Sequence, residues 1–429
     1  MDNLFTQNLS VIKDRWPELA NTVAQQDTRH LTANLVQGLD QTISINDVQL
    51  TSRHSRLKEA ELQSAQIDDH QAYISLYGTA IGDVQNVLLQ RKQLKKLSVY
   101  ILNEAIFSLI LNHTDQRNWL MDERVSLQSA IASKKIIHPF IVIPAELELA
   151  SDHHAFTRNH LLSALQADYI DKLHHIENPE IQLRLTESIP LIEADNDVGE
   201  LFNTQRNKDF FVVGAGPSLE QYYGHIENIL SREDPPLIIA VDTIAQALIL
   251  KGIKPDYVVT SDFEIEEKHL PIEASTDIPL IYLPRIKRAV LEKWAGPRYT
   301  SYAKTPIYKD INQTHPKNHL YLGGSVIHPA IDLAVKMGAS TITLFGCDFA
   351  FIDGKTHSYW PAGELDVSAQ EAKDWLLNGD GEKVYTHPNF RSYLCNLEQY
   401  IYEHSNITFY NSSRKGAQIT GTHYMTECV

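Results

Sequence analysis

Short apolar runs alternate with longer amphipathic segments through the second half of the chain. The runs fall at residues 210–213, 237–241, 257–260, 280–283, 320–322, 341–345 and 408–410. Strands that are apolar on both faces belong to the interior of a parallel sheet, and their alternation with helices is typical of a sheet covered on both sides. The pattern therefore predicts an α/β fold with a doubly wound, mostly parallel, Rossmann-like sheet.

The first half of the chain shows a smaller and less regular α/β pattern. Residues 71–104 are predicted to form a strand, a turn, a helix and a second strand. Glu104 ends that second strand, where nucleotide-binding folds often place a carboxylate for a ribose hydroxyl. Because the intervening turn, GTAIGD, has only two glycines, a structural role is favoured over a binding role.

An acidic stretch, EADNDVGE at residues 193–200, separates the two patterns. Charge-rich stretches of this kind are typical of solvated linkers. We therefore expect an N-terminal α/β domain of residues 1–200 and a larger domain of residues 201–429.

Composition narrows the class of protein. The net charge of −16 argues against a nucleic-acid backbone binder, because such proteins usually present a basic face. The three cysteines form no C-x-x-C pair, which makes a disulfide framework or a structural zinc site unexpected. The N-terminus lacks an apolar signal core, and no run of about 18 apolar residues occurs. These features predict a cytoplasmic protein without a membrane span.

The stretch FFVVGAGPSL joins the first apolar run to the following helix. Gly214 and Gly216 allow close backbone approaches. Pro217 suits a first helical turn, and Ser218 can accept a bond from a free N–H group. The first amides of a helix lack internal partners and lie at the positive end of its dipole, so the turn is a candidate phosphate cradle. A turn that serves packing alone is the alternative, because the spacing is neither G-x-G-x-x-G nor a P-loop.

Polar residues also follow several of the other predicted strands. They are Asp242, Asp262, Gly324, Ser325 and Asp348. The carboxyl ends of parallel strands meet at one edge of a sheet, where ligands of open α/β folds bind, so we expect these residues to form one site. Their carboxylates can hold Mg²⁺ or bond the ribose and base of a nucleotide, and the sequence leaves both open.

These motifs together resemble a known family. VVGAGPSL, IAVDTIAQALILKGIKPDYVVTSDFE and LGGSVIHPAIDLAVKMGASTITLFGCDFAFIDGKTHSYW resemble the central domain of the motility-associated factor (Maf) flagellin glycosyltransferases. YGTAIGD, NGDGEKVYTHPNFRSY and YNSSRKGAQITGTHY extend the resemblance over most of the chain. It implies a glycosyltransferase that moves a nonulosonic acid of the pseudaminic, legionaminic or sialic type from its CMP form to Ser or Thr hydroxyls of flagellin. It implies no required cofactor.

The central domain is similar to two further groups. Bacterial sialyltransferases share the glycine-rich turn, which implies that Gly214, Gly216, Pro217, Ser218, Asp242, Asp262, Gly324, Ser325 and Asp348 contact the nucleotide part of the donor. MptE-like pterin pyrophosphokinases share the spaced aspartates, which implies ATP and Mg²⁺ as an alternative, with Asp262 and Glu264 as ligands. A departure from the sialyltransferases is Ala350, which stands where those enzymes have a tyrosine.

Transfer to a hydroxyl requires a base, and histidine suits that task. His387, in YTHPNFRSY, lies where the resemblance to sialyltransferases implies the base, and His357 lies in the loop after Asp348. A surface role for both histidines is the alternative. Candidates for binding the donor carboxylate are Arg285, Lys287, Arg288, Arg414 and Lys415. A non-catalytic flagellin-binding module of the same fold is a further hypothesis.

Overall fold

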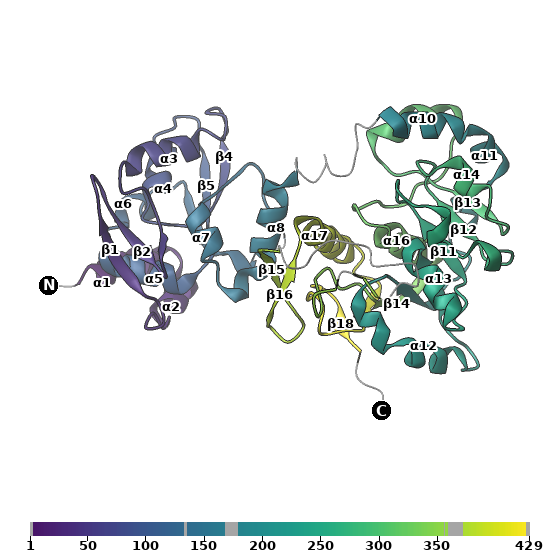
Figure 1. Ribbon diagram of the computed structural model, residues 1–429. Helices are drawn as coiled ribbons and strands as arrows, with labels where there is room; N and C mark the ends of the chain where they lie inside the picture. Colours follow the sequence, from purple (N-terminus) through teal and green to yellow (C-terminus); the bar gives the residue numbers. More distant parts are fainter. Residues whose placement is uncertain (1–2, 133–134, 168–178, 356, 359–371, 426–429) are drawn as a thin grey trace. The chain divides into compact units, whose positions relative to one another are not determined.

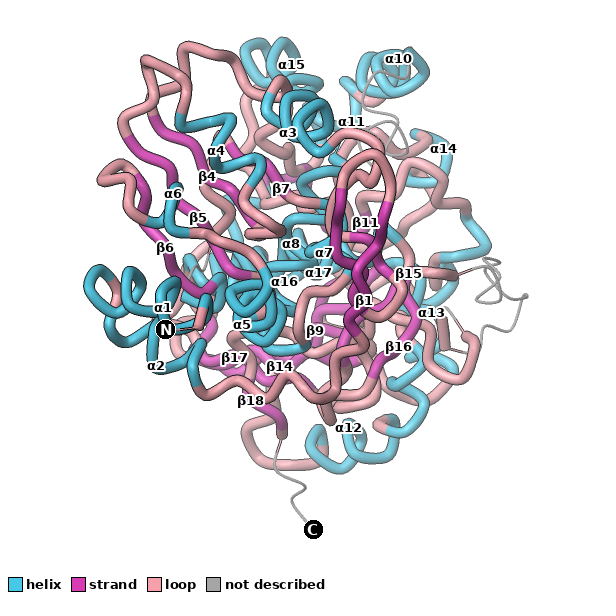
Figure 2. The backbone as a smooth tube through the Cα atoms, turned by 90° about the vertical axis from the view of Figure 1, so that its left-hand side faces the viewer, coloured by secondary structure: helices cyan, strands magenta, loops and turns pink. Residues whose placement is uncertain are grey.

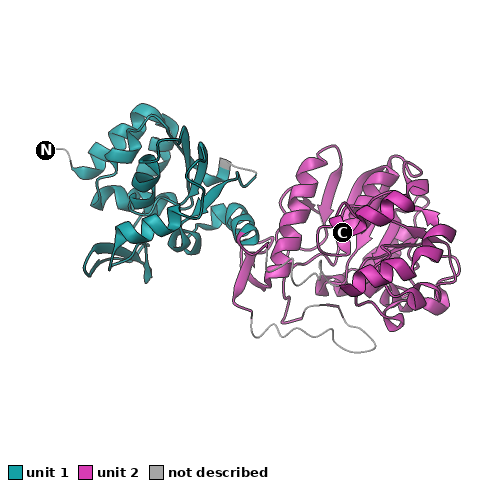
Figure 3. Ribbon diagram, turned by 90° about the horizontal axis from the view of Figure 1, so that it is seen from above, with its two compact units in different colours: residues 1–164 teal, residues 165–429 magenta. Residues whose placement is uncertain are grey.

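The structure is a computed structural model that describes residues 3–132, 135–167, 179–355, 357–358 and 372–425 (Figure 1). The chain divides into two compact units, residues 1–164 and 165–429 (Figure 3). The division precedes the boundary that the sequence placed at residue 200. The reason lies in α10 (Pro179–Glu187), whose Ile181 and Leu185 pack in one apolar cluster with Leu283 and Tyr302 of the second unit.

The first unit is built on a four-stranded parallel sheet in the order β6-β5-β4-β7, in which β6, β5 and β4 lie side by side (Figure 2). The strands are β4 (Tyr73–Tyr77), β5 (Lys96–Ile101), β6 (Val125–Ser129) and β7 (Phe140–Val142). A separate antiparallel sheet consists of β1 (Ala33–Gln37), β2 (Gln41–Ile45) and β3 (Val48–Gln49). The predicted strand, turn, helix and strand over residues 71–104 is confirmed.

The helices of the first unit enclose the parallel sheet. They are α1 (Leu4–Arg15), α2 (Pro17–Ala24), α3 (Arg56–Ser64), α4 (Asp83–Leu89), α5 (Glu104–His113), α6 (Arg117–Leu120), α7 (Pro144–Glu148) and α8 (Ala155–Leu165). Ile74, Leu76, Leu97 and Val99 of the sheet and Phe107 of α5 are almost wholly buried in one apolar cluster. This burial supplies the stabilisation that the short elements lack on their own.

The second unit contains a nine-stranded, wholly parallel sheet in the order β18-β17-β14-β9-β10-β11-β12-β13-β8. The strands expected from apolar runs are β9 (Lys208–Val213), β10 (Leu237–Val241), β11 (Tyr257–Thr260), β12 (Leu280–Tyr282), β14 (Ala339–Phe345) and β17 (Thr408–Asn411). The additional strands are β8 (Asn196–Asp197), β13 (Arg298–Thr300) and β18 (His423–Tyr424). The antiparallel pair β15 (Asp374–Leu377) and β16 (Lys383–Thr386) lies outside this sheet.

One predicted strand, at residues 320–322, is wrong. β13 is the strand that pairs with β12 at this place in the sheet. The segment at residues 320–322 forms no strand: His319 makes a single bridge with Tyr302, and the Leu320 N–H donates to Tyr302 O. Leu320 is buried against the sheet, so its apolar character reflects packing of a loop.

Helices cover the sheet of the second unit on both faces, as expected for a doubly wound fold. They are α10, α11 (Ile189–Ala194), α12 (Tyr223–Leu230), α13 (Asp242–Leu250), α14 (Arg288–Leu291), α15 (Lys309–Thr314), α16 (Ile327–Met337) and α17 (Pro388–Glu403). β9 pairs with β10 on one side and with β14 on the other, so the direction of winding reverses at β9. Such a reversal opens a crevice at the carboxyl ends of the strands. Within the described residues, no helix combines the length and apolar character needed to cross a membrane.

Candidate functional site

A cavity of about 280 Å³ lies at the carboxyl ends of β9, β10, β11 and β14. Among the residues that the sequence pointed to, those that line it are Gly214, Gly216, Asp242, Asp262, Arg285, Gly324, Ser325, Asp348 and His357. Pro217 and Ser218 are buried and do not line the cavity, and neither do Glu264 and His387. The sheet edge therefore brings together residues as far apart in the sequence as Gly214 and His357, as its topology requires.

The glycine-rich turn differs from the predicted cradle in its hydrogen bonding. The Gly214 N–H donates to Phe345 O and the Gly216 N–H to Gly346 O, each at 2.8 Å. The Ser218 N–H donates to Asp348 Oδ2 at 2.8 Å. The segment after the turn is a 3-10 helix, Pro217–Gln221, and α12 begins only at Tyr223. Three amides expected to bind phosphate thus already have partners in the protein.

Asp348 locks this turn from the neighbouring strand end. Its side chain is almost wholly buried, and burial raises the pKa of its carboxyl to about 6. A Cβ added at Gly216 would lie 2.4 Å from Asp348 Oδ2, and one added at Gly416 would lie 2.7 Å from Oδ1. Two glycines are therefore needed to admit the carboxylate, which acts as an internal anion at the position proposed for phosphate.

The start of α16 offers the amides that the glycine-rich turn does not. Gly324, Ser325, Val326 and Ile327 line the cavity, and α16 runs for 11 residues to a left-handed cap at Gly338. Within the described part of the chain, the N–H groups of Gly324 and Val326 have no hydrogen-bond acceptor. The Ser325 N–H donates to His328 Nδ1 at 3.2 Å, so the free donors at the positive end of this helix are those of Gly324 and Val326.

Two aspartates line the cavity at the ends of β10 and β11. Asp242 is fully buried, and its Oδ1 accepts from Thr243 N at 2.7 Å while its Oδ2 accepts from the Thr260 hydroxyl at 2.7 Å. Burial, followed by repulsion from Asp262, raises the pKa of Asp242 to about 7. Asp262 is exposed, and its Oδ1 accepts from Glu264 N. A ligand thus meets one buried and one solvated carboxyl group.

The raised pKa of Asp242 makes the stability of the second unit depend on pH. The folded protein binds this proton more tightly than the unfolded chain, so the stabilisation is complete below pH 3.8 and is lost as pH rises towards about 7. Asp242→Asn removes this titration. From pH 5 to pH 8 we therefore expect the wild type to lose about 2 kcal/mol of unfolding free energy that the variant does not lose. Urea unfolding at both pH values measures the difference. Parallel pH profiles for Asp242→Asn and wild type would contradict it, and Asp310→Asn, at an exposed site, is the control.

His357 is held at the cavity by its neighbour. The Ser358 N–H and hydroxyl both donate to Ala215 O, at 2.7 and 3.2 Å, which fixes the loop against the glycine-rich turn. Burial lowers the pKa of His357, which favours the neutral ring that a general base requires. His387 lies half-buried at the N-cap position of α17, and Phe390 and Tyr393 of that helix line the cavity instead.

Arg285 supplies a cation to the cavity. It follows β12, and its Nε donates to Ser261 O. The two terminal nitrogens have no acceptor within the described part of the chain, so they can bind a carboxylate or phosphate end-on. The sequence indicated Arg285 only as one of five basic residues near site loops. Tyr393 and Phe390 were missed, because on an amphipathic helix they look like ordinary core residues.

Glu104 of the first unit is not available for a ribose. Its Oε1 accepts from the Ser129 hydroxyl at 2.6 Å and lies 3.2 Å from His154 Nε2. Burial acts to raise the pKa of Glu104, but His154 and Ser129 outweigh burial and hold it below its ordinary value. The ribose contact considered for Glu104 is therefore replaced by an internal polar cluster, in keeping with the favoured structural role of this unit.

Comparison with known proteins finds one family model that matches within the second unit and two proteins similar to part of the chain. Residues 184–354 match the family model described as 6-hydroxymethylpterin diphosphokinase MptE-like. A 6-hydroxymethyl-7,8-dihydropterin pyrophosphokinase from Pyrococcus furiosus is 31% identical over 212 residues, which cover 45% of this chain and 83% of the relative. The corresponding protein of Methanothermobacter thermautotrophicus is 27% identical over 193 residues, which cover 41% of this chain and 76% of the relative.

A solved structure extends the comparison to the whole length of the chain. The Maf glycosyltransferase from Magnetospirillum magneticum AMB-1 aligns with 99% of this chain and 74% of its own, at 16% sequence identity and a TM-score of 0.44. A likeness at that level carries no functional inference. The sequence match to the Pyrococcus protein is the closer relation in identity, and by that match the chain belongs to the 6-hydroxymethylpterin diphosphokinase MptE-like family.

Proposed function

We propose that the chain is a glycosyltransferase that moves a nonulosonic acid from a CMP-activated donor to Ser or Thr hydroxyls of flagellin. The donor contains one phosphate and one carboxylate. The cavity offers two separate places for anions, the N–H groups of Gly324 and Val326 and the terminal nitrogens of Arg285. This pairing is the observation that carries the proposal.

The remaining groups of the cavity suit such a transfer. Asp242 and Asp262 bond the ribose or base of CMP, and His357 removes the proton of the acceptor hydroxyl as the bond to the sugar forms. CMP leaves with the electron pair of the broken C–O bond, so neither a metal nor a redox cofactor is required. We place the reaction in the cytoplasm, where a CMP donor and newly made flagellin meet.

The assay measures CMP release from CMP-pseudaminic or CMP-legionaminic acid with purified flagellin. We expect release by the wild type and a loss of about 100-fold in kcat/KM for Arg285→Ala, because an end-on charged contact to the substrate disappears. Lys287→Ala, two residues away and exposed, is the matched control and is expected to retain wild-type turnover. No release with either donor, given an acceptor known to be glycosylated, would overturn the proposal.

A second candidate is an Mg²⁺-ATP-dependent pyrophosphokinase, which the two archaeal relatives favour. Asp262 fits a metal ligand, since it is exposed in the cavity and Mg²⁺ commonly binds one or two carboxylates together with substrate phosphates. Glu264 lies outside the cavity lining, and within the described residues Asp242, Asp262 and Glu264 do not bring three ligand atoms together. Release of AMP from ATP in the presence of a hydroxymethylpterin and Mg²⁺ is the result that would select this function.

A further inference from the structure

The turn between β4 and α4 of the first unit binds a carboxylate from a distant part of the chain. The Thr79 N–H donates to Glu146 Oε2 and the Thr79 hydroxyl to Oε1, both at 2.9 Å. The Ala80 N–H also donates to Oε1. One short turn thus uses three donors to hold both oxygens of the Glu146 carboxylate.

This contact is sealed from solvent. Glu146 is 1% exposed, Thr79 is 0% exposed and Ala80 is 3% exposed. Burial raises the pKa of Glu146, whereas the three donors act in the opposite direction. A carboxylate without such partners would be strongly disfavoured at this depth, so the turn and Glu146 depend on each other.

The shape of the turn is that of an anion-binding nest. Gly78, Ala80 and Gly82 have positive φ angles of 101°, 39° and 92°, and between them the successive N–H groups of Thr79 and Ala80 both point at the Glu146 carboxylate. A Cβ added at Gly78 would lie 3.2 Å from Glu146 Oε2. The turn follows the carboxyl end of a central parallel strand, where Rossmann-like folds bind the phosphate of a nucleotide.

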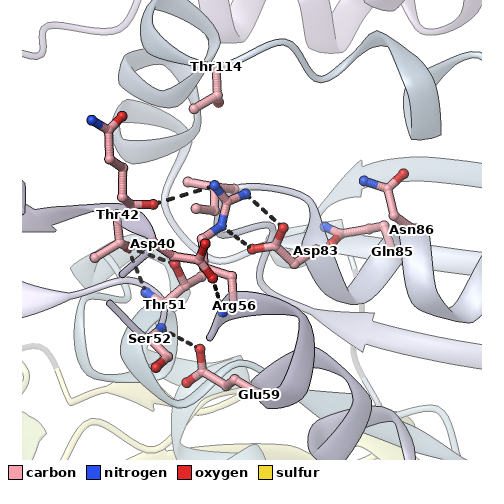
Figure 4. Close-up of polar contacts among 12 residues, drawn as sticks. Asp40, Thr42, Thr51, Ser52, Arg56, Glu59, Asp83, Gln85, Asn86 and Thr114 are labelled. Atoms are coloured by element: carbon pink, nitrogen blue, oxygen red, sulfur yellow. Dashed lines mark hydrogen bonds and ion pairs between the residues drawn. The ribbon is translucent and has the colours of Figure 1, made fainter. Parts of the chain in front are cut away.

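The outer side of the same turn is also tied down. Arg56 of α3 makes a bidentate pair with Asp83, the first residue of α4, through Nε at 2.9 Å and a terminal nitrogen at 2.7 Å (Figure 4). The Arg56 N–H donates to Asp40 between β1 and β2, so α3 and the small sheet are fixed over the start of α4. Gln85 of α4 donates to Thr79 O from within.

We infer that the turn of residues 78–82 is an anion-binding site whose resident ligand is the Glu146 carboxylate, held where this fold otherwise binds a phosphate. The ligands that can replace it are small oxyanions, with acetate matching the atoms that Glu146→Ala removes. The first unit therefore carries its own anion at this turn. This inference is independent of the function proposed for the second unit.

The test measures thermal unfolding of the full chain carrying Glu146→Ala. The matched control is Glu148→Ala, at an exposed position of the same helix. Loss of the carboxylate leaves buried donors without an acceptor, so we expect the melting temperature of Glu146→Ala to fall by about 5 °C or more. Acetate or phosphate should then raise it by several degrees more than they raise wild type or Glu148→Ala, at an ionic strength matched with chloride.

Any anion binding by the second unit is the same in all variants. A larger rise in melting temperature for Glu146→Ala than for Glu148→Ala therefore reports anion binding at the turn. The inference is overturned if Glu146→Ala melts with the wild type, or if acetate and phosphate raise its melting temperature no more than that of the control. Should Glu146→Ala fail to fold, Glu146→Gln replaces it, since the amide keeps one acceptor oxygen. Glu146→Gln that melts with the wild type would equally overturn the inference.

Discussion

Gly216→Ala is expected to cost the second unit about 3 kcal/mol or more of unfolding free energy, the largest stability loss that we predict for a single methyl group. The added Cβ would lie 2.4 Å from Asp348 Oδ2 and 2.7 Å from Gly346 O. Both neighbours are fixed, because Asp348 Oδ2 accepts from Ser218 N and Gly346 O accepts from Gly216 N. The turn, the ends of β9 and β14 and the cavity must therefore shift together.

Gly224→Ala is the matched control for this prediction. Gly224 lies in the first turn of α12, and a Cβ there would meet nothing within 4 Å. Alanine is the better helix former, so this variant should equal or exceed the wild type in stability by up to about 1 kcal/mol. Urea unfolding of both variants measures the difference. Equal stability of Gly216→Ala and Gly224→Ala would show that Asp348 does not lock the turn.

His357→Ala is expected to lower kcat/KM for CMP release by a factor of about 10²–10⁴, the range for loss of a general base. His357 lines the cavity and is held by the bonds from Ser358 to Ala215, whereas His387 is not among the lining residues. His387→Ala should therefore stay within about threefold of wild type, since its side chain does not line the cavity. The two histidines that the sequence offered as alternatives are separated by this pair of variants.

The pH dependence of the wild type provides a readout that a purely structural role of His357 would not give. A base is lost when it is protonated, so activity falls as pH drops through the pKa of His357. Because burial lowers that pKa, the acid limb should have its midpoint below pH 6.5. A His357→Ala variant with turnover near that of wild type, or a His387→Ala variant with an equal loss, would contradict the assignment.

The sequence predicted those parts of the fold that depend on local apolar runs. β10 and β11 were predicted at their observed bounds, because central parallel strands are apolar on both faces. β13 was missed because its three residues, Arg298 to Thr300, are polar or half-buried and are held in the sheet by pairing with β12. Residues 320–322 have the apolar character of a strand but pack as a loop, which only the tertiary structure decides.

The same limit applies to the candidate site. The sheet edge was predictable, since polar residues follow several of the predicted strands and parallel strands end at the same edge. The binding of a carboxylate of the same chain by each of two glycine-containing turns was not predictable. Asp348 lies 130 residues from Ser218, and Glu146 lies 67 residues from Thr79. No local pattern indicates that a turn with the spacing of a phosphate site already binds a carboxylate of its own chain.

The nucleotide preference of the full chain tests the central claim, that the cavity of the second unit binds a CMP donor. Thermal unfolding is followed with CMP, CTP, AMP and ATP, each with and without Mg²⁺. We predict that CMP at about 100 times its Kd raises the melting temperature by about 5 °C without added metal, because a ligand of the folded state stabilises it by mass action. A shift with ATP and Mg²⁺ alone, with none for cytidine nucleotides, would contradict the claim.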